Sequence, residues 1–205
     1  MDYRDVHDRA LELFKSGRFD DAIAHLEDAR YKIGAMERDH VLDLLMDLMH
    51  MSTLREPPDY KAAESYAIEA ERVSGSGYAK LQTAMLFYWA MKQPERATLK
   101  GAEALELSRR ENDTATSYQC LALLGLASLD TGDTRYASDS LCGIEQMVAA
   151  QERFVVGDET LFLERMIPTV DSDTKVRIRK LASTLASLCR GEDFAARLRR
   201  IANPG

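Results

Sequence analysis

The chain has few cysteines for its length. Only three of the 205 residues are cysteine, at Cys120, Cys142 and Cys189, and no two of them form a C-x-x-C pair. An odd number of widely spaced cysteines argues against a disulfide framework and against a zinc site. We therefore expect reduced, partly buried thiols, because a free cysteine usually packs like a small apolar residue.

Long apolar runs and proline-rich stretches are also missing. The N-terminus, MDYRDVHDRALELF, has no continuous apolar segment, which argues against a secretory signal. The longest apolar stretches, VLDLLMDLMHM and CLALLGLASL, are too short or too interrupted to cross a bilayer. The five prolines are scattered, so no segment has the composition of a long disordered linker. We expect a cytoplasmic protein without a membrane partner.

Motifs of catalysis and cofactor binding are absent from the sequence. It contains no glycine-rich phosphate loop, no H-E-x-x-H and no G-x-S-x-G. The four histidines, His7, His25, His40 and His50, are dispersed, and their spacing is not that of metal ligands on one helix face. The sequence therefore predicts a protein that is not an enzyme, with no catalytic residue, cofactor or metal.

Positive charge is scarce except near the C-terminus. Lys and Arg number 27 against 34 Asp and Glu, and the net charge of −7 argues against a nucleic-acid partner. Residues 174–205, however, contain eight basic and two acidic residues. These basic side chains either bind nucleic acid or an acidic partner, balance acidic residues elsewhere in the chain, or stay solvated. We favour the last two, because the segment lacks the aromatic interleaving that stacks on bases.

One stretch, KSGRFDDAIAHLEDA at residues 15–29, indicates a helical hairpin. The preceding residues place apolar side chains on one helical stripe, and Gly17 then ends that helix. Asp20 and Asp21 suit the first turn of a second helix, because acidic groups are favoured at the positive end of the helix dipole. Ala22 and Ala29 allow a neighbouring helix to approach closely. The stretch therefore predicts a tight antiparallel hairpin.

The same arrangement recurs along the chain. An anchoring alanine follows a turn signal four times, at Ala22, Ala63, Ala97 and Ala137, in steps of 41, 34 and 40 residues. The turns are expected near Gly17, Pro57-Pro58, Gln93 and Gly132. Because one hairpin cannot bury its own apolar face, repetition at this spacing predicts a stack of hairpins.

The recurring residues resemble the tetratricopeptide repeat (TPR) family, in about four degenerate repeats over residues 3–150. The fourth unit shows the resemblance in Leu121, Leu124-Gly125, Gly132-Asp133, Ala137 and Leu141. The first unit shows it in Ala10, Leu13, Gly17, Phe19, Ala22, Leu26 and Ala29. The third unit keeps Leu81, Tyr88, Ala97 and Ala104, with Met85 where a small residue is usual.

The resemblance implies an all-α fold, a superhelical stack of antiparallel helix hairpins. The first helix of the second unit departs most, because the register of Leu45, Leu48 and Met49 depends on the length of the turn at Pro57-Pro58. A non-repeating helical bundle with chance alanine spacing is the alternative. Two domains are expected, the repeat array at residues 1–150 and a helical cap at residues 151–205.

The C-terminal residues form the predicted cap, which is either a separate set of helices or a degenerate fifth repeat. DETLFLERMI predicts a short helix that ends near Pro168, and EDFAARLRRI predicts a last short helix. Between them we expect a helix that begins at Ser172 or Asp173 and ends at Gly191. Its apolar positions, expected to cover the end of the stack, are Val176, Leu181, Leu185 and Leu188.

In TPR proteins the first helix of each hairpin lines a concave groove that holds a segment of another protein. Transferred to this chain, the resemblance places ten residues in that groove: His7, Leu11, Phe14, Gln82, Leu86, Trp89, Gln119, Ala122, Leu126 and Leu129. Such a groove is largely apolar, so the resemblance implies an apolar or helical protein segment as the guest. Trp89 has a second interpretation, in which it fills space between units.

The resemblance thus implies a non-catalytic interaction module, such as a scaffold, adaptor or chaperone. The alternative is a peptide-sensing regulatory protein that switches a partner when its ligand binds. A sensor of that kind usually carries its own DNA-binding domain, and none is found in the sequence. The repeat pattern is compatible with a monomer and with an oligomer.

Overall fold

The computed structural model describes residues 3–32, 38–150, 157–189 and 191–204. Within these ranges the chain forms helices and loops without a strand, which confirms the all-α prediction. No helix within them is both long enough and apolar enough to cross a membrane. The helices are α1 (Tyr3–Lys15), α2 (Phe19–Lys32), α3 (Arg38–Leu54), α4 (Tyr60–Ser74), α5 (Gly77–Met85), α6 (Pro94–Arg110), α7 (Thr114–Thr131), α8 (Thr134–Ala149), α9 (Asp158–Met166), α10 (Ser172–Leu188) and α11 (Glu192–Ala202).

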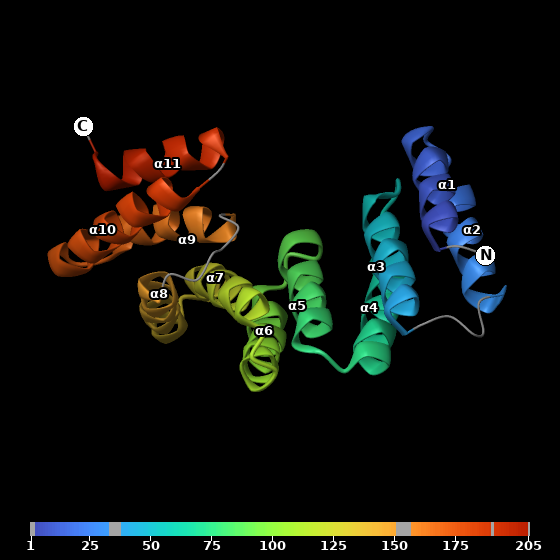
Figure 1. The fold of residues 1–205 in the computed structure, drawn as a ribbon, viewed down its shortest axis with the longest axis horizontal. Helices are drawn as coiled ribbons and strands as arrows, with labels where there is room; N and C mark the ends of the chain where they lie inside the picture. The colour runs from blue at the N-terminus through green and yellow to red at the C-terminus, as the bar shows by residue number, and fades with distance from the viewer. Residues whose placement is uncertain (1–2, 33–37, 151–156, 190, 205) are drawn as a thin grey trace.

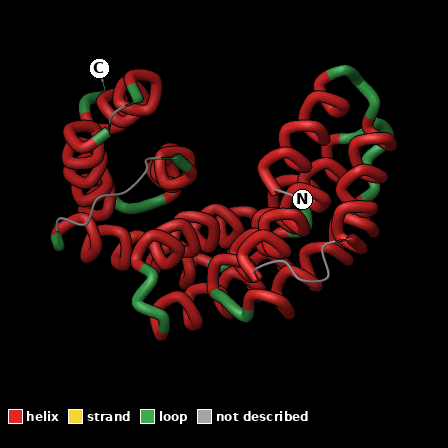
Figure 2. Tube along the Cα trace, turned by 45° about the vertical axis from the view of Figure 1, so that its right-hand side comes forward, coloured by secondary structure: helices red, strands yellow, loops and turns green. Residues whose placement is uncertain are grey.

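The helices stack in chain order as hairpins. The closely packed pairs are α1 with α2, α3 with α4, α5 with α6 and α7 with α8. Figure 1 shows them as a row, from α1 and α2 at one end to α10 and α11 at the other. Figure 2 shows that the row is curved, with an arm raised at each side. The first helices of successive hairpins also touch, α1 with α3 and α5 with α7, and we call the side that they form the inner surface.

The turns lie where the sequence predicts them. Gly17 and Gly132 follow α1 and α7 in the left-handed backbone region, with φ of +78° and +76°, which glycine adopts without steric cost. After Pro57-Pro58, the Asp59 side chain accepts a hydrogen bond from the Ala62 N–H (2.9 Å) and caps α4. Gln93 precedes α6, whose first residue is proline.

The four anchoring alanines are buried, as predicted. Ala22, Ala63 and Ala97 are completely inaccessible to solvent and Ala137 is 3 % exposed. The ambiguous register of the second unit is also resolved, because Leu45, Leu48 and Met49 are all buried in α3. Residues from successive hairpins share apolar clusters, in which alanines pack beside larger side chains. This packing stabilises the stack.

We predict that Ala137→Leu destabilises the protein by about 1–3 kcal/mol, because the added methylene groups have no space at the buried face of α8. The matched control is Ser138→Leu, on the exposed side of the same helix, where little change is expected. Urea unfolding of both variants measures the difference. If Ala137→Leu unfolds at the same urea concentration as the parent, the register assigned to the fourth unit is wrong.

For the C-terminal helices, the predicted bounds agree with the structure better than the predicted buried residues do. The helix α10 begins after Asp171, whose side chain accepts a hydrogen bond from the Thr174 N–H (2.8 Å), so the cap precedes the expected Ser172 or Asp173. Leu181 and Leu185 are buried as predicted, but the prediction for Val176 and Leu188 is wrong: they are 62 % and 51 % exposed. The buried stripe instead consists of Ile178, Leu181, Ala182 and Leu185.

The helix α9 does not pair with α10. It packs mainly against α7, whereas α10 packs closely with α11. In Figure 1 α9 lies between α7 and the α10–α11 pair. The C-terminal hairpin therefore consists of α10 and α11, and α9 is an additional helix against the first helix of the fourth unit, on the inner surface.

Some basic side chains of the C-terminal segment balance acidic groups in the same molecule, one of the two expected arrangements. The Arg177 guanidinium reaches Glu145 of α8 (2.5 Å), and that of Arg197 reaches Glu164 of α9 (2.5 Å). The first ion pair joins the cap to the stack, and the second joins α11 to α9 within residues 151–205. The cysteines are unpaired as expected, Cys120 buried and Cys189 partly buried, but Cys142 is exposed, contrary to the expectation of partial burial.

Candidate functional site

The inner surface of the first two hairpins carries a polar and aromatic cluster. The Tyr3 hydroxyl donates a hydrogen bond to Asp47 Oδ2 (2.8 Å), and His7 Nδ1 lies 2.6 Å from the same oxygen. The His40 ring stacks on Tyr3, with the ring centroids 5.7 Å apart. Burial, and then the neighbouring Asp47, raise the pKa of the Tyr3 hydroxyl. His7, a predicted groove residue, is thus held between α1 and α3 by Asp47.

The other predicted residues of the first unit are half-buried. The Phe14 ring packs edge-on against Phe19 at a centroid distance of 4.9 Å, at the turn between α1 and α2. Leu11 is also half-buried, one turn before Phe14 on α1. Each of these two residues retains part of its surface toward solvent, as the groove prediction requires, but no pocket described in the structure includes them.

A pocket of about 490 Å³ lies between α3 and α5. These two first helices are not a closely packed pair, whereas α5 and α7 are in contact, and the pocket lies where α3 and α5 face each other. Three predicted groove residues, Gln82, Leu86 and Trp89, line it. The complete lining is Met49, His50, Thr53, Leu54, Tyr60, Gln82, Met85, Leu86, Trp89, Ala90 and Lys92. The pocket is therefore mainly apolar, with a polar rim.

A wide helical turn shapes one wall of this pocket. After Met85 the helix α5 continues as a π-helical turn, η1 (Leu86–Ala90), in which the Met91 N–H donates to the Leu86 carbonyl oxygen (3.0 Å). Lys92 follows with φ of +55°, in the left-handed region. Turns of this pitch are rare and occur often at functional sites. Here the turn carries both Leu86 and Trp89 into the pocket wall.

Trp89 has both of the roles that the sequence left open. Its side chain is half-buried against the apolar cluster that extends from α5 to α11, and its ring meets the Tyr88 ring edge-on at a centroid distance of 4.7 Å. Burial raises the pKa of the Asp158 carboxyl at the start of α9, and the nearby Trp89 indole partly opposes this rise. The same side chain lines the pocket, with Lys92 Nζ 5.9 Å from its ring centroid. Trp89 thus packs between elements and also presents a surface to the pocket.

The inner surface of the fourth unit is covered by α9. Ala122 and Leu126 are 1 % and 0 % exposed, so the prediction that these two residues face an open groove is wrong. Leu129 is half-buried, like Leu11 and Phe14, and its place in a groove stays a prediction. The close fit depends on Gly125, where a Cβ atom would lie 2.6 Å from the Phe162 ring of α9. Gln119 is the one predicted residue of this unit that is exposed.

A three-residue network fastens α9 to the stack. The Arg165 guanidinium forms an ion pair with Asp130 at the end of α7 and donates to the Tyr88 hydroxyl (3.0 Å). Tyr88 in turn donates to Asp130 Oδ2 (2.7 Å). Burial, and then this carboxylate, raise the pKa of Tyr88 to about 12. The wide turn of η1, the end of α7 and α9 are therefore joined through one set of hydrogen bonds.

Glu159 is a buried carboxyl group at the N-terminal end of α9. Its side chain is 2 % exposed and accepts a hydrogen bond from the Gly157 N–H (2.7 Å). Burial raises its pKa from 4.5 to about 7, because removal from water disfavours the charged form. Between these two pH values the folded protein binds the proton and the unfolded chain releases it. The contribution of Glu159 to the free energy of unfolding therefore falls as the pH rises from about 4.5 to about 7.

We predict that Glu159→Gln stabilises the protein at about pH 8 by up to about 3 kcal/mol and has little effect at about pH 4. Glutamine keeps an oxygen for the Gly157 N–H and carries no charge that must be buried. Urea unfolding at the two pH values measures the effect. An equal change in stability at both would show that Glu159 does not titrate as its burial implies.

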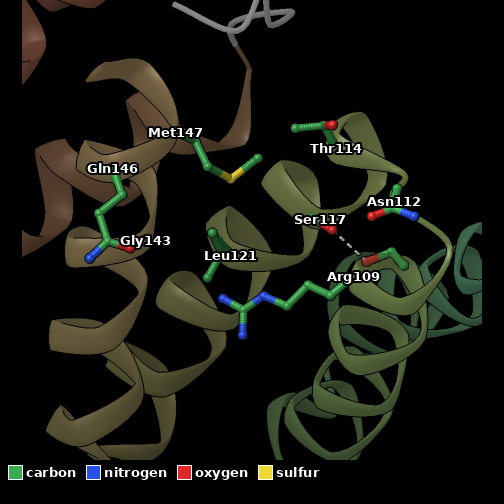
Figure 3. A pocket seen from close by; sticks show the side chains of 9 residues that line it. Arg109, Asn112, Thr114, Ser117, Leu121, Gly143, Gln146 and Met147 are labelled. Carbon is green, nitrogen blue, oxygen red and sulfur yellow. Dashed lines mark hydrogen bonds between the residues drawn. The ribbon is translucent and has the colours of Figure 1, made fainter. Parts of the chain in front are cut away.

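A second pocket, of about 310 Å³, lies among α6, α7 and α8 (Figure 3). Its wall includes residues of the connector RRENDTAT, in which Asp113 caps α7 by accepting a hydrogen bond from the Thr116 N–H (3.0 Å). The hydroxyls of Ser108 and Ser117 bond to each other (2.8 Å), so their polarity is satisfied within the wall. Arg109 is the one charged residue of the lining. The pocket lacks the paired acid and base groups that catalysis needs.

Sequence reasoning missed more than half of the lining of the α3–α5 pocket. The α3 residues were missed because the register of the second unit was ambiguous. Lys92 was missed because it follows a wide turn for which the sequence gives no signal. Leu54, 63 % exposed at the end of α3, was detectable in principle, because a large apolar residue there has no partner in the helical stripe.

No protein-family model matches the chain, and no curated protein is similar to it in sequence. The resemblance to TPR proteins therefore depends on the recurring residues themselves.

Proposed function

We propose that the chain is a non-catalytic interaction module that holds a segment of a partner protein against its inner surface, between α3 and α5. The observation that carries the proposal is the pocket at this place, whose wall is mainly apolar and includes the only tryptophan of the chain. Aromatic side chains at the edge of an apolar pocket dominate many protein interfaces. A scaffold, an adaptor or a chaperone of the TPR type would use such a surface.

Burial elsewhere on the inner surface supports this placement. In the fourth unit α9 covers the first helix, and in the first unit Asp47 engages His7. Between α3 and α5, large apolar side chains are left open to water: Leu54 is 63 % exposed and Tyr60 is 38 % exposed. Exposed apolar groups gathered at a concave place are typical of a binding site.

We predict that Leu54→Glu weakens partner binding by at least about tenfold, because a carboxylate in the pocket must lose water when the partner enters. A partner captured by the parent protein is the ligand, and calorimetry measures its affinity. Because Leu54 is largely exposed, the variant should keep the stability of the parent.

The matched control is Leu99→Glu. Leu99 is 71 % exposed on α6, the second helix of its hairpin, and does not line the pocket. This variant should bind as the parent does. If Leu54→Glu binds with the parent's affinity, or if Leu99→Glu loses affinity instead, the binding surface is not the one between α3 and α5.

A further inference from the structure

The charge of the α3–α5 pocket is opposite to that of the whole chain. The protein has a net charge of −7, yet no Asp or Glu is among the residues that line this pocket. Its polar lining consists of Lys92, His50, Thr53 and Gln82. Burial lowers the pKa of His50 and so favours its neutral form, which leaves Lys92 as the charged residue of this lining. An acidic protein thus presents an apolar pocket with a positive charge at its rim, and that charge favours a partner with a negative charge.

Lys92 is available to a partner. It forms no ion pair with a carboxylate of the described residues, whereas Lys80 and Lys100 nearby in the sequence both pair with Glu71 and Glu103. Its Nζ lies 5.9 Å from the Trp89 ring centroid, and its charge also contributes to the lowered pKa of Asp130, a carboxylate whose ion pair is with Arg165. The ammonium group therefore remains beside the pocket without a negative neighbour in ion-pair contact, at the end of the wide turn.

The inner surface already accepts a helix in the next unit. There α9 lies against α7, its Phe162 ring fits over Gly125, and its first turn carries the acidic residues Asp158 and Glu159. Trp89 belongs to both places, because it packs against the apolar cluster that contains Phe162 and also lines the α3–α5 pocket. The pocket therefore adjoins a surface that already binds a helix. That helix is α9, which contributes an apolar side chain and has an acidic first turn.

We propose that the α3–α5 pocket binds an amphipathic helix of a partner protein, which inserts a large apolar side chain and places an acidic residue about one turn away against Lys92. This inference rests on the proposed function and specifies the chemistry of its partner. The apolar side chain is held by Leu86, Met85 and Trp89, and the carboxylate replaces water around Lys92. A helix with the same apolar side chain but a basic residue in place of the acidic one is disfavoured, because its positive charge would lie beside that of Lys92.

A displayed library of helical peptides, randomised along one face, provides the probe. Selection on the parent protein should enrich one large apolar residue together with Asp or Glu about one turn away. Lys92→Glu should weaken the selected acidic peptides about tenfold and strengthen the same peptides with Lys in place of the acid. Lys180→Glu, an exposed charge reversal on α10, is the control and should leave both affinities unchanged. Thermal melting confirms that the variants are folded.

The outcomes separate this inference from the proposed function. Selected peptides without acidic enrichment, or a Lys92→Glu variant that weakens acidic and basic peptides alike, would overturn the inference. If binding of those peptides is still lost in Leu54→Glu, the proposed function stands without it. If no selected peptide is affected by Leu54→Glu, both the inference and the proposed function fail.

Discussion

A chain that ends after Pro168 is expected to aggregate or to lose most of its stability. The truncation removes α10 and α11, whose Ile178, Leu181, Leu185, Leu198 and Ile201 are buried in the same apolar cluster as α7 and α9. Burial of one such side chain is worth roughly 1.5–3 kcal/mol, so the loss of several approaches the total stability of a domain. The end of the stack would also be exposed to water, and a solenoid needs a cap there.

Size-exclusion chromatography and thermal melting test the truncation. The control is a chain that ends after Ala202, which retains every helix. We expect the control to be monodisperse with an unchanged melting temperature. A truncated chain that is soluble and melts at the temperature of the full chain would show that α10 and α11 are independent of the stack, and would contradict their role as a cap.

Phe162→Ala is expected to cost about 3–5 kcal/mol, since its ring is completely buried and fills the space over Gly125. The cavity left behind cannot close easily, because α9 is held by the ion pairs Arg165–Asp130 and Arg197–Glu164. The variant should therefore unfold at a much lower urea concentration, or release α9 from α7.

Phe194→Ala is the matched control for this prediction. Phe194 is 37 % exposed on α11 and its loss should cost about 1 kcal/mol or less. Hydrogen exchange distinguishes global unfolding of Phe162→Ala from local release of α9, which would expose the amides of residues 158–166 alone. If the two variants are equally stable, α9 is not packed on α7 as described.

Local residue patterns were sufficient to predict the hairpins. A small residue at a close helix contact and a glycine in a left-handed turn are both dictated by short-range geometry, so Ala22, Ala137, Gly17 and Gly132 were found from the sequence. The end of α7 is set in the same way by Gly132, without reference to the rest of the chain. The number and order of the hairpins follow from these positions.

The place of α9 could not be predicted, because it depends on contacts between residues far apart in the sequence. Nothing in DETLFLERMI states that Phe162 meets Gly125 or that Arg165 meets Asp130. This one contact changes the candidate site, since it buries Leu126 and leaves the predicted groove open only at Trp89 and its neighbours. The error at Val176 and Leu188 has a similar origin, because several faces of α10 are apolar enough to be the buried one.

The fluorescence of Trp89 tests the central claim most directly. It is the only tryptophan of the chain and lines the α3–α5 pocket, so all tryptophan emission comes from a residue of that pocket. Titration with a captured partner or a selected helical peptide should give a saturable shift of the emission to shorter wavelength, with the affinity found by calorimetry, and the shift should vanish in Leu54→Glu. Binding that calorimetry detects but that leaves the Trp89 emission unchanged would contradict a binding site between α3 and α5.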